Sequence, residues 1–582
     1  MSRYLFSWKI GGEAGFGIKS SGLMFSRLCN RVGYEVFGYD EYPSLIRGGH
    51  NTFEVTVGKE PVASVARSID ILVALNTEAI TRHRNELNHG AVIIYDEKTT
   101  QITLTEDELK RNIKLEHVPF GEIVASVKGS PVMRNTVSLG ASAALLQIPF
   151  KMLAGVIEHT FGHKAEVLDT NVKVAQLGYD VIAKRIEAID FKIKLPEIPN
   201  NIEMLLTGNE ALALGALAAD LRFYAAYPMT PSSSILHYLA TKAVSEKLIV
   251  KHAEDEIAVI NMALGASHTG VRAMIGTSGG GFSLMVEALG LTGITETPLV
   301  IVNVQRPGPA TGLPTWTEQG DLRFVMHAAQ GDFPRIVLAP GDHAECFYLT
   351  AEAFNYADRY QVPVIILSDK FLAESYRTVQ DFNDSLVKID MAKSVMSDSA
   401  LARMKNYKRY AVTETGISPR SVPGQANGVY LANSDEHDEF GYSTEESAMR
   451  IAQVRKRAEK FALAAKALNG ANLYGDPKAK TTVVAWGSMK GPVQDAIHWL
   501  PDKLRDRINF LHLNILWPFP SEKVRQILSR SKQALLVENN SNAQLGGLIR
   551  EQTGIHIEHR LLKYDGRPPY IGEIKERIMD LF

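Results

Sequence analysis

Short apolar runs alternate with helix-like patterns over residues 1–190. The strand-like runs include "YLFSWKI", "ILVALN" and "AVIIYD", and the clearest amphipathic patterns are "GIKSSGLMFSRLCNRVG" and "KVAQLGYDVIAKRIEAI". In these patterns the apolar residues recur at the spacing of one helix face. Strands interleaved with helices are typical of a parallel sheet in a doubly wound domain. We therefore predict one α/β domain over residues 1–190.

A second alternating block follows a linker. Residues 191–202 include "KLPEIPNN", whose two prolines and paired asparagines predict a linker. Residues 203–380 then carry apolar runs that nearly all end in Gly, Pro or polar residues, among them "RFYAAYP", "PLVIVNVQRPG" and "PVIILSDK". Such runs suit strands buried on both faces of a sheet. Because open α/β sheets bind ligands beyond the carboxyl ends of their strands, we expect a ligand site at these polar ends.

The rest of the chain divides in two. Over residues 381–475 the pattern gives way to clusters such as "SPRSVPGQANG" and "NSDEHDEFGYSTEE", which indicate an insertion or connector that carries subunit contacts. Residues 476–582 return to alternation with "KTTVVAWGS", "FLHLNILWPFP" and "QALLVENN". We therefore predict an α/β protein of several doubly wound domains, in keeping with a length of 582 residues that exceeds one hydrophobic core.

Composition and charge narrow the class of protein. With 45% hydrophobic and 22% charged residues, the chain has the composition of a folded globular protein. A net charge of −2 gives no electrostatic basis for binding nucleic acid or an anionic membrane. We find neither an apolar stretch of transmembrane length nor a signal-peptide pattern, so we expect a cytoplasmic location. The two cysteines, Cys29 and Cys346, are too few for a four-thiolate cluster, and a disulfide is not expected.

The stretch "AYPMTPSSSILHYL" joins a strand-like run to a helical pattern. Pro228 and Pro231 each fix their own backbone and push the preceding residue towards an extended conformation. They hold Thr230 in a rigid loop at the end of a strand, where its hydroxyl can contact a ligand. For Ser232 or Ser233, a cap of the following helix is the favoured interpretation.

Within this stretch, "YPMTPSS" resembles the YPITPSS signature of the 2-oxoacid:ferredoxin oxidoreductases, which are thiamine-diphosphate enzymes that also use CoA. Three further segments follow in the family's order. The segment "HAEDEIAVINMALGAS" is similar to the family's acidic strand-to-helix segment, and "GTSGGGFSLMVEALG" to its glycine-rich turn. The segment "VNVQRPGPATGLPTWTEQGDL" is similar to its RGGPSTGLPT-type loop, with Pro307 where the family commonly has glycine.

The resemblance extends to the organisation of the domains. Residues 1–190 look like the γ subunit of the family, fused ahead of an α subunit as in its two-subunit members. Residues 203–380 look like the domain that binds the aminopyrimidine side of the cofactor, and residues 476–582 resemble the C-terminal domain of transketolase-like folds. The resemblance therefore implies a thiamine-diphosphate-binding, transketolase-like fold with an added N-terminal γ-type domain.

Thiamine diphosphate needs a carboxyl group on its aminopyrimidine ring. Burial favours the protonated carboxyl that can donate to a ring nitrogen. The acidic segment offers Glu254, Asp255 and Glu256 between a strand and a helix, with Asp255 a good helix cap. On local grounds alone, all three are acids that a helix N-terminus favours. Alignment with the family motif implies that Glu256 is the activating, catalytic acid.

Arg306 comes directly after a buried strand-like run, where a guanidinium can grip a carboxylate bidentately. The alternative for this arginine is a surface ion pair. The resemblance implies that Arg306, Thr315 and Thr230 bind the 2-oxoacid. For Gly279, Gly280 and Gly281, a tight turn and room for the cofactor ring are compatible interpretations. The residues expected to contact the cofactor are Tyr227, Pro228, Gly279 and Gly280.

The glycine loop "WKIGGEAGFG" near the N-terminus does not have the G-x-G-x-x-G spacing of a dinucleotide site, so NAD binding is weakly supported. The γ-type resemblance implies instead a scaffold domain that contacts CoA or a partner subunit. The segment "EYPSLIRGGHNTFEV", which includes Arg47, belongs to the same resemblance, and an exposed loop is its alternative interpretation.

Two motifs of the complete enzyme are missing from this sequence. There is no GDG motif for Mg²⁺ and the diphosphate, and no C-x-x-C for an iron–sulfur cluster. The resemblance implies that a β subunit supplies the diphosphate site, Mg²⁺ and a [4Fe-4S] cluster, and that the chain itself binds no metal. We expect an (αβ)₂ heterotetramer that shares thiamine diphosphate between the two chains and reduces ferredoxin.

The predicted activity is oxidative decarboxylation of a 2-oxoacid, with 2-oxoglutarate favoured, to an acyl-CoA and CO₂. A second basic group for the distal carboxylate of 2-oxoglutarate is not identifiable in the sequence. One alternative is a component of an NAD-linked 2-oxoacid dehydrogenase, which would leave residues 1–190 unexplained. Another is a non-catalytic assembly subunit that binds CoA or a nucleotide and tolerates loss of Glu256.

Overall fold

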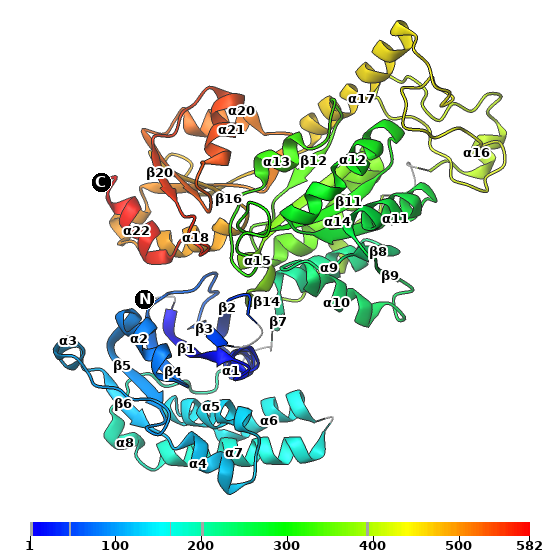
Figure 1. The fold of residues 1–582 in the computed structure, drawn as a ribbon. Helices are drawn as coiled ribbons and strands as arrows, with labels where there is room; N and C mark the ends of the chain where they lie inside the picture. Colours follow the sequence, from blue (N-terminus) through cyan, green and yellow to red (C-terminus); the bar gives the residue numbers. More distant parts are fainter. Residues whose placement is uncertain (1–3, 46–47, 163, 200–202, 391–394) are drawn as a thin grey trace.

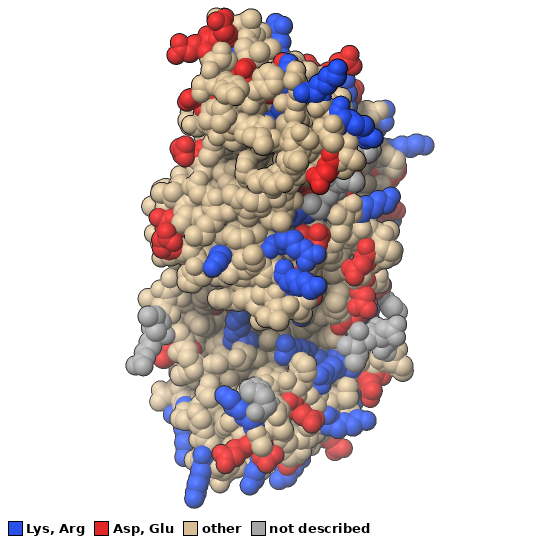
Figure 2. Space-filling model, turned by 90° about the vertical axis from the view of Figure 1, so that its right-hand side faces the viewer, with Lys and Arg blue, Asp and Glu red and all other residues tan. Residues whose placement is uncertain are grey.

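The computed structural model describes residues 4–45, 48–162, 164–199, 203–390 and 395–582. Within these residues the strands form sheets of eight, seven and five strands. The N-terminal domain lies at the bottom of Figure 1, the second domain lies above it in green, and the third lies beside the second in orange and red. Figure 2 shows the molecule from its side as a tall, narrow body. The predicted α/β class is confirmed.

The N-terminal sheet is mixed rather than parallel. Its own strands are β1 (Tyr4–Ala14), β2 (Glu35–Glu41), β3 (Gly48–Gly58), β4 (Ile69–Ala74), β5 (Leu87–Tyr95) and β6 (Lys114–His117). The pairs β1–β4, β4–β5 and β5–β6 are parallel, whereas β3 is antiparallel to both β1 and β2. The expectation of a parallel sheet is therefore wrong for β2 and β3, which pair antiparallel with their neighbours. The reason is the short connection between β2 and β3, which permits only antiparallel pairing.

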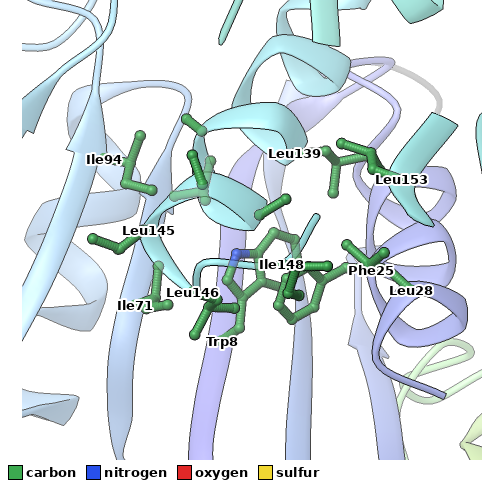
Figure 3. Close-up of a cluster of buried hydrophobic side chains, with 14 of the residues drawn as sticks. Trp8, Phe25, Leu28, Ile71, Ile94, Leu139, Leu145, Leu146, Ile148 and Leu153 are labelled. Atoms are coloured by element: carbon green, nitrogen blue, oxygen red, sulfur yellow. The ribbon is translucent and has the colours of Figure 1, made fainter. Parts of the chain in front are cut away.

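Helices cover the N-terminal sheet and complete its core. They are α1 (Ile18–Arg31), α2 (Thr77–His83), α3 (Glu106–Lys110), α4 (Phe120–Ser126), α5 (Arg134–Leu145), α6 (Phe150–Phe161), α7 (Ala165–Ala183) and α8 (Ile186–Ile189). Figure 3 shows Trp8 of β1 against Phe25 of α1, with ring centroids 4.3 Å apart. The Trp8 indole N–H donates to Ser142 Oγ of α5 at 3.0 Å, so the buried polar atom of the ring is satisfied.

Two strands from the next segment of the chain extend this sheet. They are β7 (Met204–Thr207) and β14 (Tyr376–Val379), and the order is β6-β5-β4-β1-β3-β2-β14-β7. β14 pairs antiparallel with β2 on one side and with β7 on the other. Residues at both ends of the predicted segment 203–380 therefore belong to the N-terminal sheet, which fixes the first two domains to each other.

The second domain is built on a seven-stranded sheet. Its strands are β8 (Phe223–Ala226), β9 (Ile249–His252), β10 (Ala273–Thr277), β11 (Leu299–Gln305), β12 (Ile336–Leu338), β13 (Pro363–Asp369) and β18 (Ile515–Trp517), in the order β18-β12-β13-β11-β10-β8-β9. All pairs are parallel except β12–β18, whose second strand arrives from the third domain. The predicted burial on both faces is confirmed for β10, β11 and β13, which are buried along their whole length, but it is wrong for β9, which is mostly exposed because it lies at the edge of the sheet.

Helices pack on both faces of this sheet, as a doubly wound fold requires. They are α9 (Gly208–Ala218), α10 (Ser233–Lys242), α11 (Glu256–His268), α12 (Gly279–Thr295), α13 (Leu322–His327), α14 (His343–Tyr360) and α15 (Lys370–Glu374). Alternate strand residues face opposite cores. Ile275 and Ile301 pack in the cluster of α11 and α12, whereas Met274 and Val300 pack in the cluster of α9 and α14.

The third domain contains a five-stranded sheet with helices around it. The strands are β15 (Ala471–Gly475), β16 (Thr481–Trp486), β17 (Ile508–Leu513), β19 (Gln533–Glu538) and β20 (His559–Leu562), in the order β15-β17-β16-β19-β20. The helices are α18 (Lys490–His498), α19 (Asp502–Arg505), α20 (Ser521–Leu528), α21 (Gln544–Thr553) and α22 (Ile571–Met579). Its apolar residues share one core with α11 and α12, so this domain packs firmly on the second.

Residues 395–467 form an arm that projects from the second domain at the upper right of Figure 1. It contains the short helix α16 (Asp398–Ala402), long irregular connections and the helix α17 (Ser447–Ala467). Cys29 and Cys346 are both buried free thiols, as expected from their number. Among the described helices, none has the length and apolar character needed to cross a membrane.

Candidate active site

Two predicted substrate residues meet at the carboxyl edge of the second sheet. Thr230 lies in the loop after β8, and Arg306 follows β11 directly. The Arg306 guanidinium donates from Nη1 to the backbone carbonyl of Thr230 at 2.7 Å. Burial lowers the pKa of Arg306, and Asp321 opposes this shift by its charge. The arginine is therefore a half-buried cation whose remaining donors can bind an anion.

The serines after Thr230 do not act as predicted. Ser232 stands at the N-cap position of α10, but its side chain caps no backbone N–H. Its hydroxyl donates instead to the carbonyl of Met229 at 2.7 Å. The expected helix cap by a serine is wrong, because the backbone of Ser232 is already helical (φ −78°, ψ −15°), whereas a capping residue has an extended backbone.

The two acids at the start of α11 differ in their surroundings: Asp255 caps the helix, and Glu256 is buried. Asp255 is the N-cap of α11, and its Oδ1 accepts the Ala258 N–H at 2.7 Å, which confirms the predicted cap. Glu256, the first residue of the helix, turns inward and is only 4% exposed. Its Oε1 is buried and has no hydrogen-bond partner among the described residues. A buried polar atom without a partner is unfavourable by about 1–3 kcal/mol, so this oxygen is suited to a ligand that completes the bond.

A glycine turn makes room for this carboxyl group. A Cβ atom at Gly281 would lie 2.7 Å from Glu256 Oε1 and 2.2 Å from Thr277 Oγ1, so no side chain fits there. At Gly279 a Cβ atom would lie 2.5 Å from a carboxylate oxygen of Asp321. At Gly280 a Cβ atom would lie 3.7 Å from the Ala310 carbonyl oxygen, an ordinary contact that a small side chain could make. All three glycines were predicted to leave room for the cofactor ring, and the structure adds that Gly281 is the one nearest Glu256.

Polar residues behind the turn were not predicted. Asn303 of β11 donates to Asp321 Oδ2 at 3.0 Å, and Gln305 accepts the Asp321 N–H at 3.0 Å. Burial raises the pKa of Asp321, and Asn303 and Arg306 oppose the shift. Burial and then the charge of Asp321 raise the pKa of Glu318 to about 7. The available signal was "VIVNVQ", in which two amides interrupt an otherwise apolar strand.

Thr315 meets a residue from another domain. Its side chain is 5% exposed, and its hydroxyl donates to the carbonyl of Tyr42 in the N-terminal domain at 2.6 Å. The structure therefore brings the γ-type domain to the loop that begins at Arg306. A direct contact between Thr315 and the substrate stays a prediction.

The expected cofactor contacts on the loop after β8 are accessible. Tyr227 is 39% exposed, with its ring centroid 6.3 Å from that of His252, and Pro228 is exposed as well. Their role also stays a prediction. Arg47 lies outside the described residues. In the part of the chain that the structure describes, no group of three or more His, Cys, Asp or Glu side chains is placed to hold a metal ion.

Three family models match successive parts of this chain. "Pyruvate ferredoxin/flavodoxin oxidoreductase" matches residues 7–181, and "Pyruvate flavodoxin/ferredoxin oxidoreductase, thiamine diP-bdg" matches residues 214–456. "Pyruvate:ferredoxin oxidoreductase core domain II" matches residues 479–569. The middle match covers the site residues from Tyr227 to Asp321 and identifies a thiamine-diphosphate-binding domain.

Relatives match over the whole chain. The 2-oxoacid:ferredoxin oxidoreductase subunit alpha of Saccharolobus solfataricus is 35% identical over 98% of this chain and 97% of its own. The 2-oxoglutarate synthase subunit KorA of Methanothermobacter thermautotrophicus is 32% identical over 65% of this chain and 99% of its own. The solved structure of 2-oxoglutarate:ferredoxin oxidoreductase from Magnetococcus marinus, with 2-oxoglutarate, coenzyme A and succinyl-CoA bound, superposes with a TM-score of 0.91. It is 31% identical, and the match covers 100% of both chains, which confirms the predicted fold.

Proposed function

The chain belongs to the 2-oxoacid:ferredoxin oxidoreductase family, and from this premise we propose that it oxidises 2-oxoglutarate with CoA to succinyl-CoA and CO₂. The 2-oxoacid gives up two electrons in this reaction, and two ferredoxins accept one electron each. The relatives named for 2-oxoglutarate, and the similar structure that contains 2-oxoglutarate and CoA, support this choice of substrate. One observation carries the proposal, namely the buried Glu256 carboxyl with an unpartnered oxygen beside Gly281, where no side chain fits.

The residues present fit thiamine diphosphate. When bound, this cofactor supplies the nucleophilic carbon and the electron sink that the decarboxylation requires. Glu256 would hold a proton between Oε1 and a nitrogen of the aminopyrimidine, and the lack of side chains at Gly279, Gly280 and Gly281 would leave room for the ring. Arg306 would bind the carboxylate next to the keto group with the donors that its bond to Thr230 leaves free. Water exclusion around the ring strengthens both interactions.

An exposed apolar face supports a partner chain at this site. Ile257 and Met262 of α11 are 51% and 40% exposed, and Leu284 of α12 is 53% exposed. Figure 2, which looks at the side where α10, α11 and α16 lie in Figure 1, shows an area with few charged side chains above mid-height and a group of Lys and Arg below it. Helices that are apolar on all sides are normally buried, so we infer that a second chain covers α11 and α12.

The covering chain is proposed to be a β subunit that holds the diphosphate, Mg²⁺ and a [4Fe-4S] cluster, in an (αβ)₂ assembly. The family membership and the relatives named as alpha subunits support a multi-subunit enzyme. A β subunit on this face would stand directly beside Glu256, because α11 begins at that residue. The N-terminal domain is proposed to contact CoA, on the basis of its γ-type resemblance.

The test is the Glu256→Gln variant in the reconstituted complex, assayed with 2-oxoglutarate, CoA and a viologen dye or ferredoxin. Loss of a proton-sharing acid is expected to lower kcat about 10²–10⁴-fold. The matched control is Glu254→Gln, because Glu254 is exposed two residues earlier and its loss should leave kcat unchanged. An undiminished rate in Glu256→Gln would favour the non-catalytic subunit instead. A panel of 2-oxoacids on the wild-type complex tests the choice of substrate, and NAD in place of ferredoxin tests the dehydrogenase alternative.

A further inference from the structure

The loop that carries Arg306 is fixed at its two ends. At one end the Arg306 guanidinium is bonded to the Thr230 carbonyl at 2.7 Å, and at the other the Thr315 hydroxyl is bonded to the Tyr42 carbonyl at 2.6 Å. Residues 308–313 between them are exposed. The position of the far end therefore depends on a residue of the N-terminal domain.

Tyr42 is itself held by the second domain. Its phenol hydroxyl donates to the carboxylate of Glu374, with distances of 3.1 and 3.3 Å to the two oxygens. Its ring centroid lies 5.1 Å from the ammonium of Lys370, which is completely buried. Lys370 and Glu374 are the first and last residues of α15, the helix that follows β13. Tyr42 thus lies between α15 on one side and Thr315 on the other.

The charges around Tyr42 keep this arrangement defined at neutral pH. Burial, followed by the charges of Glu374 and Asp40, raises the pKa of the Tyr42 phenol, so the hydroxyl stays protonated and can donate. The Lys370 ammonium lies 3.7 Å from Glu374 and 3.8 Å from Asp40. These two carboxylates neutralise its positive charge between the two domains. A donor to a buried carboxylate makes a stronger bond than one between neutral groups.

We propose that Tyr42 is a positioning residue for the 2-oxoacid: it ties Thr315 to α15 and so fixes the loop that presents Arg306. The N-terminal domain then contributes to substrate binding without touching the substrate. This inference rests on the proposed function of Arg306. A looser loop weakens the hold on the substrate carboxylate but leaves Glu256 in place, so KM for the 2-oxoacid should change and kcat should not.

The test is Tyr42→Phe in the reconstituted complex, a change that keeps the ring and the backbone carbonyl. KM for 2-oxoglutarate is expected to rise about tenfold, the effect of about 1.4 kcal/mol, with kcat within about twofold of wild type. The matched control is Tyr34→Phe, which deletes a phenol bonded to the Pro196 carbonyl at 3.0 Å in the same domain but away from the loop. An unchanged KM in Tyr42→Phe would overturn the inference.

A second kinetic comparison asks whether Tyr42 and Thr315 act together. Thr315→Val deletes the donor to the Tyr42 carbonyl, so its KM should rise at least as much as in Tyr42→Phe. Adding Tyr42→Phe to Thr315→Val should then raise KM no further, because the link is already broken. Increases that multiply in the double variant would show that the two residues act independently and would contradict the inference.

A readout without catalysis separates this inference from the proposed function. Hydrogen exchange of the backbone N–H groups of Leu313 and Trp316, which are bonded to Pro307 and Leu313, reports on the loop directly. Exchange there should be faster in Tyr42→Phe than in Tyr34→Phe, and equal exchange would refute the role of Tyr42. If the wild-type complex oxidised no 2-oxoacid, the proposed function would fail, whereas the exchange result would still decide whether Tyr42 holds the loop.

Discussion

The base of the arm depends on one buried carboxylate. Glu296, at the end of α12, is 1% exposed, and its Oε1 lies 2.5 Å from the Lys456 ammonium. Lys460 forms a second ion pair with the same side chain, and Arg409 donates to the Glu296 carbonyl at 2.8 Å. The three cations come from the arm and the carboxylate from the second domain. Glu296→Gln therefore removes the anion that neutralises buried cations of the arm.

The expected loss is about 3–5 kcal/mol, the usual effect of leaving a buried charge without its partner. It should lie at the lower end of that range, because burial lowers the pKa of Lys460 to about 7 and this lysine can lose its proton. Lys460→Met leaves the one-to-one pair of Glu296 with Lys456 intact. Its expected effect is therefore below about 1 kcal/mol, because a buried ion pair contributes little net stability compared with apolar packing.

Lys460 also makes the free energy of unfolding depend on pH, and the sign of this dependence follows from its pKa. The pKa of Lys460 is lower in the folded protein than its ordinary value of 10.5, so between about pH 7 and pH 10 the unfolded chain binds more protons. Stability from this group therefore increases as the pH rises through that window. Lys460→Met should remove this part of the slope.

Urea unfolding, followed together with limited proteolysis of the arm, measures these effects. The control is Glu439→Gln, since Glu439 pairs with Lys408 on the more exposed side of the arm, where the two side chains are 23% and 37% exposed. Exposed pairs contribute at most about 1 kcal/mol, so the control should unfold close to wild type. The reasoning would be refuted if Glu296→Gln cost less than about 1 kcal/mol, or if Lys460→Met were equally damaging.

Three further substitutions test the site and the partner face. Gly281→Ala places a methyl group 2.7 Å from Glu256 Oε1 and should lower activity at least about 10²-fold, whereas Gly290→Ala in the same helix has 3.7 Å of clearance and should not. Arg306→Lys loses the guanidinium fork and should raise KM for the 2-oxoacid about 10–100-fold in steady-state assays, and an unchanged KM would remove Arg306 from the pocket. Leu284→Asp should leave the melting temperature of the isolated chain unchanged and abolish co-purification with the β subunit; retained co-purification would place the interface elsewhere.

The alternation of apolar runs and helical patterns was sufficient to predict the α/β class. A strand buried on both faces has a local signature, and β11 and β13 carried it as "PLVIVNVQ" and "PVIILSD". The pairing of strands has no such signature when the partners are far apart in sequence. β14 pairs with β2 more than three hundred residues earlier, so the sequence could not show that residues 376–379 belong to the N-terminal sheet.

The parts of the site that depend on neighbouring residues in the sequence could be predicted. Asp255 had to be outside as a cap, and its neighbour Glu256 could then turn inward, so the sequence favoured a buried acid at that position once the family motif was aligned. The cap at Ser232 failed for a local reason too, because its backbone is already helical and a capping residue has an extended backbone. The close approach of Gly281 to Glu256 was not predicted, because a glycine needed for close approach looks the same in sequence as one needed for a turn.

The hydrogen-bond partner of Thr315 could not be predicted from the sequence. The family resemblance implied that its hydroxyl binds the 2-oxoacid, and a matching motif indicates which residue is present at a position. It does not determine what that residue contacts. The acceptor is the carbonyl of Tyr42, a backbone atom 273 residues away, and a backbone acceptor leaves no trace in residue type at either position. The contact exists because β2 and α15 bring the two segments together, and α15 is placed by the same sheet that holds Arg306. Thr315, which the resemblance assigns to substrate binding, is therefore bonded to the N-terminal domain, and this contact links that domain to the loop that carries Arg306.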